Sequence, residues 1–176
     1  MKYSKIEQLV LLILDRAHKQ GMADLSKFQI FKITYLLQVM AIKYAGVPLL
    51  PGTTFVRNTN GPISVDLYNA LENLEIQGLL KKSITKKEDY KYPRHGYRIA
   101  KKLPKLYLSK GEVIFADNFI AKLLPLTHNR LKDLAYATEP MRKIVAQEKG
   151  ELKKGTLIDF SLVTVDPDTV DGYSDG

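Results

Sequence analysis

The sequence predicts a single α+β domain that is predominantly helical, with five or six helices and a small antiparallel sheet. The chain has 176 residues, 45% hydrophobic and 26% charged, which suits one compact unit with a core. Serine residues that are followed three positions later by glutamate or glutamine precede apolar runs of helical period. Between residues 54 and 100, the expected elements follow the order of a winged helix: helix, strand, basic wing, strand.

Two capped helices are expected at the start of the chain. Ser4 and Glu7 have the spacing of a capping box, so a first helix should extend from there to near Gly21. Residues 26–29 repeat this spacing with a glutamine, and the apolar period after them continues to Gly46. The sequence therefore predicts two amphipathic helices before the first prolines.

The middle of the chain is expected to combine a short strand, a third helix and a hairpin. Residues 53–57 are β-branched or aromatic, and a dense turn signal follows them. Ser64 is the expected N-cap of the third helix, and Gly78 is its expected stop. Residues 79–85 and 97–100 should be the strands of a hairpin with a long basic tip. We expect the strand at 53–57 to join this hairpin in one antiparallel sheet.

Three further helices are expected in the last third of the chain. A capping box at residues 109–112 starts the fourth helix, and Pro125 ends it. The fifth helix should begin near Thr127 or Asn129, before a short sixth helix over residues 141–149. These helices complete the predicted core.

The end of the chain differs from the rest in composition. Residues 157–163 have strand propensity, and a clamp across the core is an equal alternative for them. From Thr164 onward there is no apolar periodicity, so the domain should occupy residues 1–163 and residues 164–176 should form a flexible acidic tail. One expectation is that this tail covers the basic hairpin transiently, because a short tether gives a high effective concentration; the favoured alternative is an acidic end that only keeps the chain soluble. The residues of the tail that carry this expectation are Asp166, Asp168, Asp171, Tyr173 and Asp175.

The charge distribution favours an anionic partner. The net charge is +8, from 27 basic and 19 acidic residues. Nucleic acid and an acidic protein face are both compatible with this charge, and a solvated hairpin that binds neither is an equal alternative. The residues expected to contact nucleic acid, if it is the partner, are Lys81, Lys82, Lys86, Lys87, Lys91, Arg94 and Arg98.

The charge of the third helix makes binding to the major groove of duplex DNA unfavourable. Its exposed face should carry three acidic side chains, and no Lys or Arg occurs between Ile63 and Gln77. DNA phosphates repel such a face. A protein partner is the favoured alternative, and the residues expected to contact it are Asp66, Tyr68, Asn69, Glu72 and Asn73.

The sequence offers no recognisable catalytic or metal-binding motif. There is no cysteine, no glycine-rich phosphate loop, and no pair of histidines at helical metal-ligand spacing among His18, His95 and His128. We therefore expect no enzymatic activity, no metal and no cofactor. The apolar run at residues 9–14 ends too early for a membrane span or a signal peptide, so we expect a cytoplasmic protein without a membrane partner.

Four segments carry a resemblance to a known family. Residues 31–38 (FKITYLLQ) and 60–71 (NGPISVDLYNAL), together with Leu131–Leu134 and the Glu139-Pro140-Met141 run, resemble the Panacea domain family over residues 5–163. Asn60 stands where the family usually has an aromatic residue, Tyr136 where histidine is common, and Met141 where tryptophan is common.

The resemblance implies a mostly helical, non-enzymatic protein of bacterial or phage origin. Such a protein would be an antitoxin that neutralises a partner toxin, or an adaptor that presents a client for proteolysis. Within the resemblance, Gly61-Pro62 should fix the turn before the third helix, and Tyr68 should place its ring against the second helix. The alternative from another class is a winged-helix transcription regulator that binds DNA through the basic wing at residues 81–105.

Overall fold

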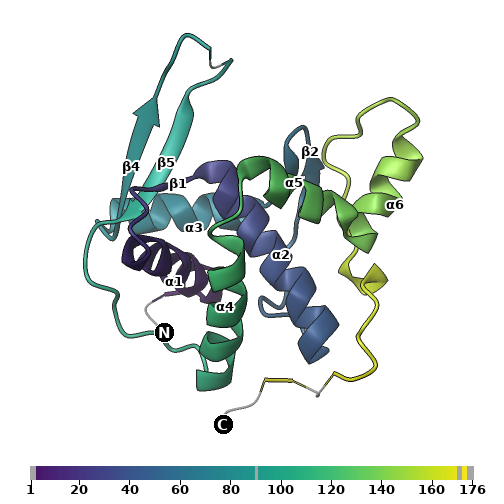
Figure 1. Ribbon diagram of the computed structural model, residues 1–176, viewed down its shortest axis with the longest axis horizontal. Helices are drawn as coiled ribbons and strands as arrows, with labels where there is room; N and C mark the ends of the chain where they lie inside the picture. Colours follow the sequence, from purple (N-terminus) through teal and green to yellow (C-terminus); the bar gives the residue numbers. More distant parts are fainter. Residues whose placement is uncertain (1–2, 90, 170–171, 174–176) are drawn as a thin grey trace.

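The structure of the protein is a computed structural model that describes residues 3–89, 91–169, 172 and 173. Figure 1 shows a group of helices from which one long hairpin projects. The predicted class, α+β and mostly helical, is confirmed. The helices are α1 (Lys5–Lys19), α2 (Lys27–Ala45), α3 (Val65–Ile76), α4 (Lys110–Leu123), α5 (His128–Ala137), α6 (Glu139–Glu148) and the short 3-10 helix η1 (Phe160–Leu162). The strands are β1 (Leu25–Ser26), β2 (Val56–Asn58), β3 (Gly61–Ile63), β4 (Leu80–Thr85) and β5 (Arg94–Ile99).

Serine caps start four of the helices, as predicted. The Ser4 amide donates to Glu7 Oε1 at 2.9 Å, and the Glu7 amide donates to Ser4 Oγ at 3.2 Å. The same reciprocal pair of bonds forms at the starts of α2 and α4, while Ser64 caps α3 by accepting from the Leu67 amide. Each cap satisfies amides that the first helical turn leaves free, and a cap of this kind stabilises a helix by about 1 kcal/mol.

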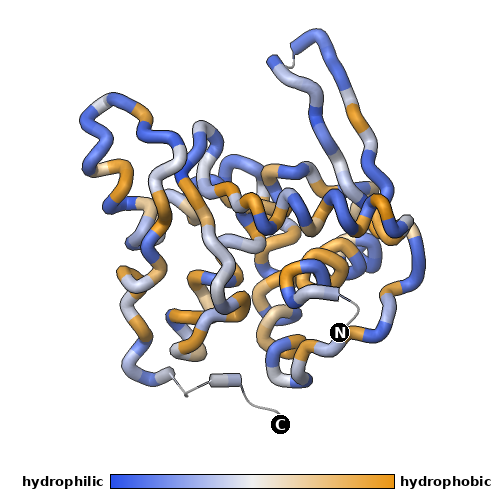
Figure 2. The backbone as a smooth tube through the Cα atoms, turned by 180° about the vertical axis from the view of Figure 1, so that it is seen from behind, coloured by the Kyte–Doolittle hydropathy of each residue, from blue (hydrophilic) through white to orange (hydrophobic). Residues whose placement is uncertain are grey.

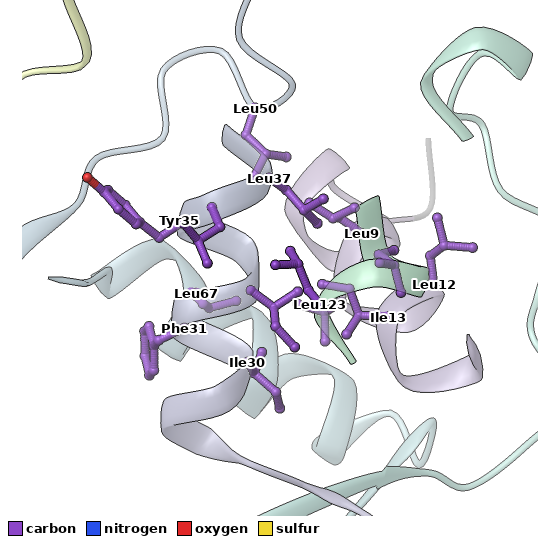
Figure 3. Packing of buried hydrophobic residues seen from close by; sticks show 14 of the residues in the cluster. Leu9, Leu12, Ile13, Ile30, Phe31, Tyr35, Leu37, Leu50, Leu67 and Leu123 are labelled. Atoms are coloured by element: carbon purple, nitrogen blue, oxygen red, sulfur yellow. The ribbon is translucent and has the colours of Figure 1, made fainter. Parts of the chain in front are cut away.

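Helix α2 forms the centre of the core. It contacts α1, α4 and α5 as well as strands β1, β3 and β5. Figure 3 shows leucine and isoleucine side chains of α1, α2 and α4 meeting beside this helix, with Leu67 of α3 next to them. Burying each such side chain contributes about 1.5–3 kcal/mol. No helix of the described ranges, α2 included, is long and apolar enough to cross a membrane.

The first half of the chain has the topology of a winged helix. The elements of a winged helix come in the order α1, β1, α2, α3, β4, β5, with the β2–β3 pair inserted between α2 and α3. The three strands of the main sheet lie in the order β1–β5–β4. Leu25 pairs with Tyr97 and Leu80 pairs with Ile99, both in antiparallel register. The winged-helix arrangement predicted for residues 54–100 is thus present and begins earlier, at α1.

One predicted strand pairing is wrong. The strand expected at residues 53–57 does not join the hairpin; instead β2 pairs with β3 across a tight turn, with Val56 opposite Ile63. The third strand beside the hairpin is β1, which has only two residues. A segment this short carries no propensity signal, and its pairing depends on where α1 and α2 place it against β5.

Residues 157–163 do not form a strand. They form a clamp across the core, which was the other expectation for this segment. Leu157 makes a single bridge to Val56, the Ile158 amide donates to the Phe55 carbonyl at 2.9 Å, and η1 follows. The Phe160 ring packs against Tyr35 and Phe55, with ring centroids 5.7 and 5.8 Å away. The segment therefore closes the core beside β2.

The described part of the predicted tail lies against the C-terminal end of α2. The Asp166 amide and the Thr169 hydroxyl both donate to the Lys43 carbonyl, at 2.9 and 2.8 Å. The Tyr173 hydroxyl donates to the Val47 carbonyl, and its ring contacts Phe115. In Figure 1 this segment and the hairpin lie at opposite ends of the molecule. The expectation that the tail covers the hairpin is therefore wrong for Asp166, Asp168 and Tyr173, while Asp171 and Asp175 lie outside the described residues.

Candidate functional sites on α3 and the hairpin

The β4–β5 hairpin presents basic side chains on both of its faces. Figure 2 shows the hairpin as a mostly hydrophilic projection from an apolar base. Because side chains alternate along a strand, the register places Lys82 on the same face as Tyr97 and His95, and Lys81 on the other face with Arg98 and Arg94. Lys86, Lys87 and Lys91 lie at the exposed tip. The seven residues expected to contact nucleic acid are therefore spread around the hairpin.

Arg94 anchors the hairpin to the rest of the domain. Its guanidinium donates to both carboxylate oxygens of Asp24, at 2.8 and 3.1 Å. Hydrogen bonds from Arg94 lower the pKa of Asp24 below its ordinary value. A Cβ atom at Gly96 would collide with this carboxylate, so glycine is required there for the ion pair to form. The sequence predicted a phosphate contact for Arg94, whereas its charge is engaged within the protein.

The residues of α3 expected to contact a protein partner are divided between two faces. Asp66, Asn69 and Asn73 line a groove of about 430 Å³ together with residues 4–7 and 50–53. Within this groove, Asp66 accepts a hydrogen bond from the Thr54 amide at 3.2 Å. These three side chains therefore adjoin the start of α1 rather than the hairpin.

Tyr68 lies on the other side of α3, against α2. Its ring centroid is 4.7 Å from that of Phe31, which confirms the predicted position of the ring. The Lys27 ammonium lies 5.4 Å from the centre of the Tyr68 ring, within the range of a cation–π contact. Tyr68 therefore links α3 to the first turn of α2.

The outward face of α3 combines apolar and acidic side chains. Val65 is 65% exposed and Ile76 is 75% exposed, and Glu72 and Glu75 are exposed between them. Ile76 lies eleven positions after Val65, so the stripe is roughly 16 Å long. We call these four residues, with Tyr68, the α3 stripe.

A cleft opens between the hairpin and the N-termini of α2 and α5. This hairpin cleft has a volume of about 680 Å³, and its walls are the first turn of α2, the hairpin residues Asp89 and 91–95, Asn60 and His128. Phe28 and Tyr92 contribute aromatic rings. Lys27, Lys91 and Arg94 contribute positive charge, and Asp89 is the one carboxylate of the described wall.

Lys32 lies behind the wall of the hairpin cleft and is 1% exposed. Its ammonium is 5.6 Å from the centre of the Phe28 ring, and its Cε atom lies beside Gly61. Among the described residues it has no acidic partner within ion-pair distance. Burial lowers the pKa of Lys32 to about 8, and the nearby charge of Lys132 adds to this effect.

Two histidines meet at the same cleft. His95 comes from β5 and His128 from the start of α5. Burial lowers the pKa of both side chains, with further lowering from Lys82 and Lys27 at His95 and from Lys32 and Lys132 at His128. Both imidazoles are therefore mainly neutral at pH 7, and each can donate one hydrogen bond from one ring nitrogen and accept one at the other. Sequence reasoning treated the histidines as isolated, and no spacing signal connects positions so far apart.

Tyr136 and Met141, two of the residues that differ from the common residues of the Panacea family, have structural roles. The Tyr136 hydroxyl accepts a hydrogen bond from Arg57 Nη1 at 2.6 Å, and Arg57 forms a buried ion pair with Glu148 at 3.1 Å. Met141 is fully buried. These contacts join α5 and α6 to β2.

Within residues 3–89, 91–169 and 172–173, no three histidine, aspartate or glutamate side chains come together as a metal site would require. Comparison with family models, with curated proteins and with solved structures finds no match to this chain.

Proposed function

We propose that the chain is a non-enzymatic interaction module that presents the α3 stripe to a protein partner. The observation that carries this proposal is the exposure of Val65 and Ile76 on a helix with acidic neighbours. In a winged helix this is the helix that would enter the major groove of DNA. With Glu72 and Glu75 outward and no basic residue on α3, its charge opposes contact with phosphates.

The stripe indicates the chemistry of the partner. Exposed aliphatic side chains at the two ends and a tyrosine beside them match the apolar centre of a protein interface. The two glutamates favour a partner with lysine or arginine around an apolar patch, because complementary charges increase the association rate and the specificity. The Panacea resemblance would make this partner a toxin, or a client that is presented for proteolysis.

Site-specific crosslinking in the cell of origin tests the proposal. A photoreactive residue at Ile76 should capture a specific partner, whereas the same residue at Val145, an exposed aliphatic position on α6, should not. With the purified partner, Val65→Lys and Ile76→Lys should each weaken binding by about 10- to 100-fold, and Val145→Lys should leave it unchanged. Equal capture at both positions, or unchanged affinity in the α3 variants, would contradict the proposal.

The action of the partner separates the two forms of this function. If the partner arrests growth when expressed alone and growth recovers on co-expression, the chain acts as an antitoxin. If the partner instead loses abundance only when the chain is present, the chain acts as an adaptor. Val65→Lys should abolish either effect.

A second candidate is DNA binding through the hairpin, which the lysines at its tip favour. Lys86 and Lys91 are exposed there, and they can reach phosphates without placing α3 in a groove. Binding to duplex DNA should then weaken with salt, and the slope of log K against log salt should fall by about 0.9 for each phosphate contact removed. Lys86→Ala and Lys91→Ala test this, with Lys122→Ala on α4 as the control. Absence of binding at low salt would eliminate this candidate.

A further inference from the structure

The buried ammonium of Lys32 is the starting point for a second site, separate from the α3 stripe. A buried charge without a counter-charge opposes folding, since its hydration is lost and nothing replaces it. Lys32 is in this position: it is 1% exposed, and its described neighbours are the Phe28 ring, Gly61, His128 and Lys132. A bound anion would supply the missing partner.

Other groups at the hairpin cleft favour the same kind of ligand. Helices α2 and α5 both begin at its wall, and the N-terminal ends of helices carry partial positive charge that stabilises anions. Lys27 comes from the first turn of α2, and burial together with the charge of Lys82 lowers its pKa. His128 can donate a hydrogen bond while it is neutral. Cationic and donor groups from two helices and the hairpin thus surround one cavity.

We propose that the hairpin cleft binds the phosphate group of a small phosphorylated molecule, with Lys27 and His128 of its wall as donors and with the ammonium of Lys32, next to Phe28 behind that wall, as a stabilising charge. The cavity of about 680 Å³ is much larger than a phosphate ion needs and lies within the range of small-molecule sites. The rings of Phe28 and Tyr92 line the same cavity and offer flat surfaces on which a base can stack. A nucleoside monophosphate is the ligand class that uses both features.

The placement of Lys32 favours a small ligand over a nucleic acid strand. A duplex backbone contacts exposed lysines, such as Lys86 and Lys91 at the tip of the hairpin, and it cannot bring its phosphates to a side chain that the protein encloses. A terminal phosphate on a small molecule can enter the cleft and bind beside Phe28, where the charge of Lys32 acts on it from behind the wall. Loss of binding on removal of Lys32 therefore distinguishes the cleft from the hairpin surface.

Isothermal titration calorimetry of the full chain with four probes tests this inference. The probes are inorganic phosphate, ribose 5-phosphate, adenosine 5′-monophosphate and adenosine. We expect phosphate-bearing probes to bind and adenosine to bind far more weakly. Adenosine 5′-monophosphate should bind more tightly than ribose 5-phosphate if a base stacks in the cleft, whereas equal affinities would assign the site to the phosphate group alone and still support the proposal.

Variants locate the site. Lys27→Met, at the lysine of the cleft wall, should weaken the binding of adenosine 5′-monophosphate by about 10- to 100-fold, because it removes a charge-assisted hydrogen bond. Lys32→Met should weaken it by about 10-fold, because the Lys32 charge acts on the phosphate without direct contact. His128→Gln should weaken it less. Lys101→Met, at an exposed lysine beyond the base of the hairpin, is the matched control and should change the affinity less than threefold, about the scatter expected of a surface charge.

Three results would overturn the inference. One is that no phosphate-bearing probe binds at a concentration of about 1 mM. A dissociation constant of about 1 mM corresponds to a binding free energy of only about 4 kcal/mol, so even a weak site would be detected. Another is unchanged affinity in a folded Lys32→Met variant. The third is tighter binding of an oligonucleotide than of any small probe, with loss on Lys86→Ala and Lys91→Ala but not on Lys32→Met. None of these tests depends on a partner at the α3 stripe.

Discussion

Replacement of Lys32 by methionine should raise the free energy of unfolding by about 2 kcal/mol at pH 7 in the absence of ligand. Methionine has nearly the same length and volume, so it fills the space beside Phe28 and Gly61 without the charge. The expected gain follows from the buried position of the ammonium, which is 1% exposed and has no acidic partner among the described residues. The substitution removes the penalty for placing that charge away from water.

The size of the expected stabilisation follows from the pKa of Lys32. Burial lowers it from 10.5 to about 8, and each pH unit corresponds to 1.36 kcal/mol, which gives an upper bound of about 3 kcal/mol. The cation–π contact of the ammonium with the Phe28 ring, at 5.6 Å, offsets part of this penalty, so the expected value is about 2 kcal/mol. For a chain of this length, this change corresponds to an increase of about 4–8 °C in the unfolding temperature.

The pH dependence has a definite sign. The pKa of Lys32 is lower in the folded protein than in the unfolded chain, so the unfolded chain binds more protons between about pH 8 and pH 10.5. The stability of the unmodified protein should therefore rise with pH across that window, relative to Lys32→Met. The difference between the two proteins should be full below pH 8 and should vanish above pH 10.5.

Urea unfolding followed by circular dichroism at pH 7, 8, 9 and 10 measures this difference. Lys122→Met is the control, since Lys122 is exposed on α4 and its removal should change the stability by less than about 0.5 kcal/mol. A Lys32→Met protein of equal or lower stability at pH 7 would refute the reasoning. So would a stability difference that stays constant up to pH 10, because it would arise from packing rather than from charge.

The remaining predictions concern the fold. Arg57→Met should destabilise the protein at pH 7, because it leaves Glu148 without its ion-pair partner. Since Arg57 lowers the pKa of Glu148, this loss of stability should shrink as the pH falls below the ordinary glutamate pKa of about 4.5. Urea unfolding at pH 7 and pH 3 measures the difference. Gly61→Ala should lower the stability by about 1–3 kcal/mol, because the residue has a φ of 108° that alanine adopts only under strain. Thermal unfolding beside Ala121→Gly, a change of helix propensity at an exposed position of α4, gives the comparison. Leu67→Ala should cost about 2–5 kcal/mol, since the side chain is fully buried between α3 and α2, and an unchanged urea midpoint would contradict this packing.

Local sequence signals determined where the helices begin. Capping is a contact between residues three positions apart, so Ser4, Ser26 and Ser109 specify the starts of α1, α2 and α4 without reference to the rest of the chain. The period of the apolar residues and the basic hairpin were sufficient for the α+β class and for the winged-helix order. These features depend on neighbours in the sequence, and they were predicted correctly.

Longer-range pairings were decided by the tertiary structure. Strand β1 exists because α1 and α2 hold Leu25 opposite Tyr97, and the contact of Asp166 with Lys43 exists because the chain returns to the end of α2. Neither contact has a local signature. The same applies to the hairpin cleft, whose walls come from four segments that are distant in the sequence.

Lys32 shows most directly what the sequence alone could not predict. The apolar period of residues 30–44 places a lysine at position 32 on the less apolar side of an amphipathic helix, where solvent is the expected neighbour. In the structure, α2 is surrounded by α1, α4, α5 and the strands, so that side of the helix is buried as well. The sequence determined that position 32 carries a positive charge; only the packing of the other elements around α2 decided that this charge is enclosed, because burial depends on what the rest of the chain covers.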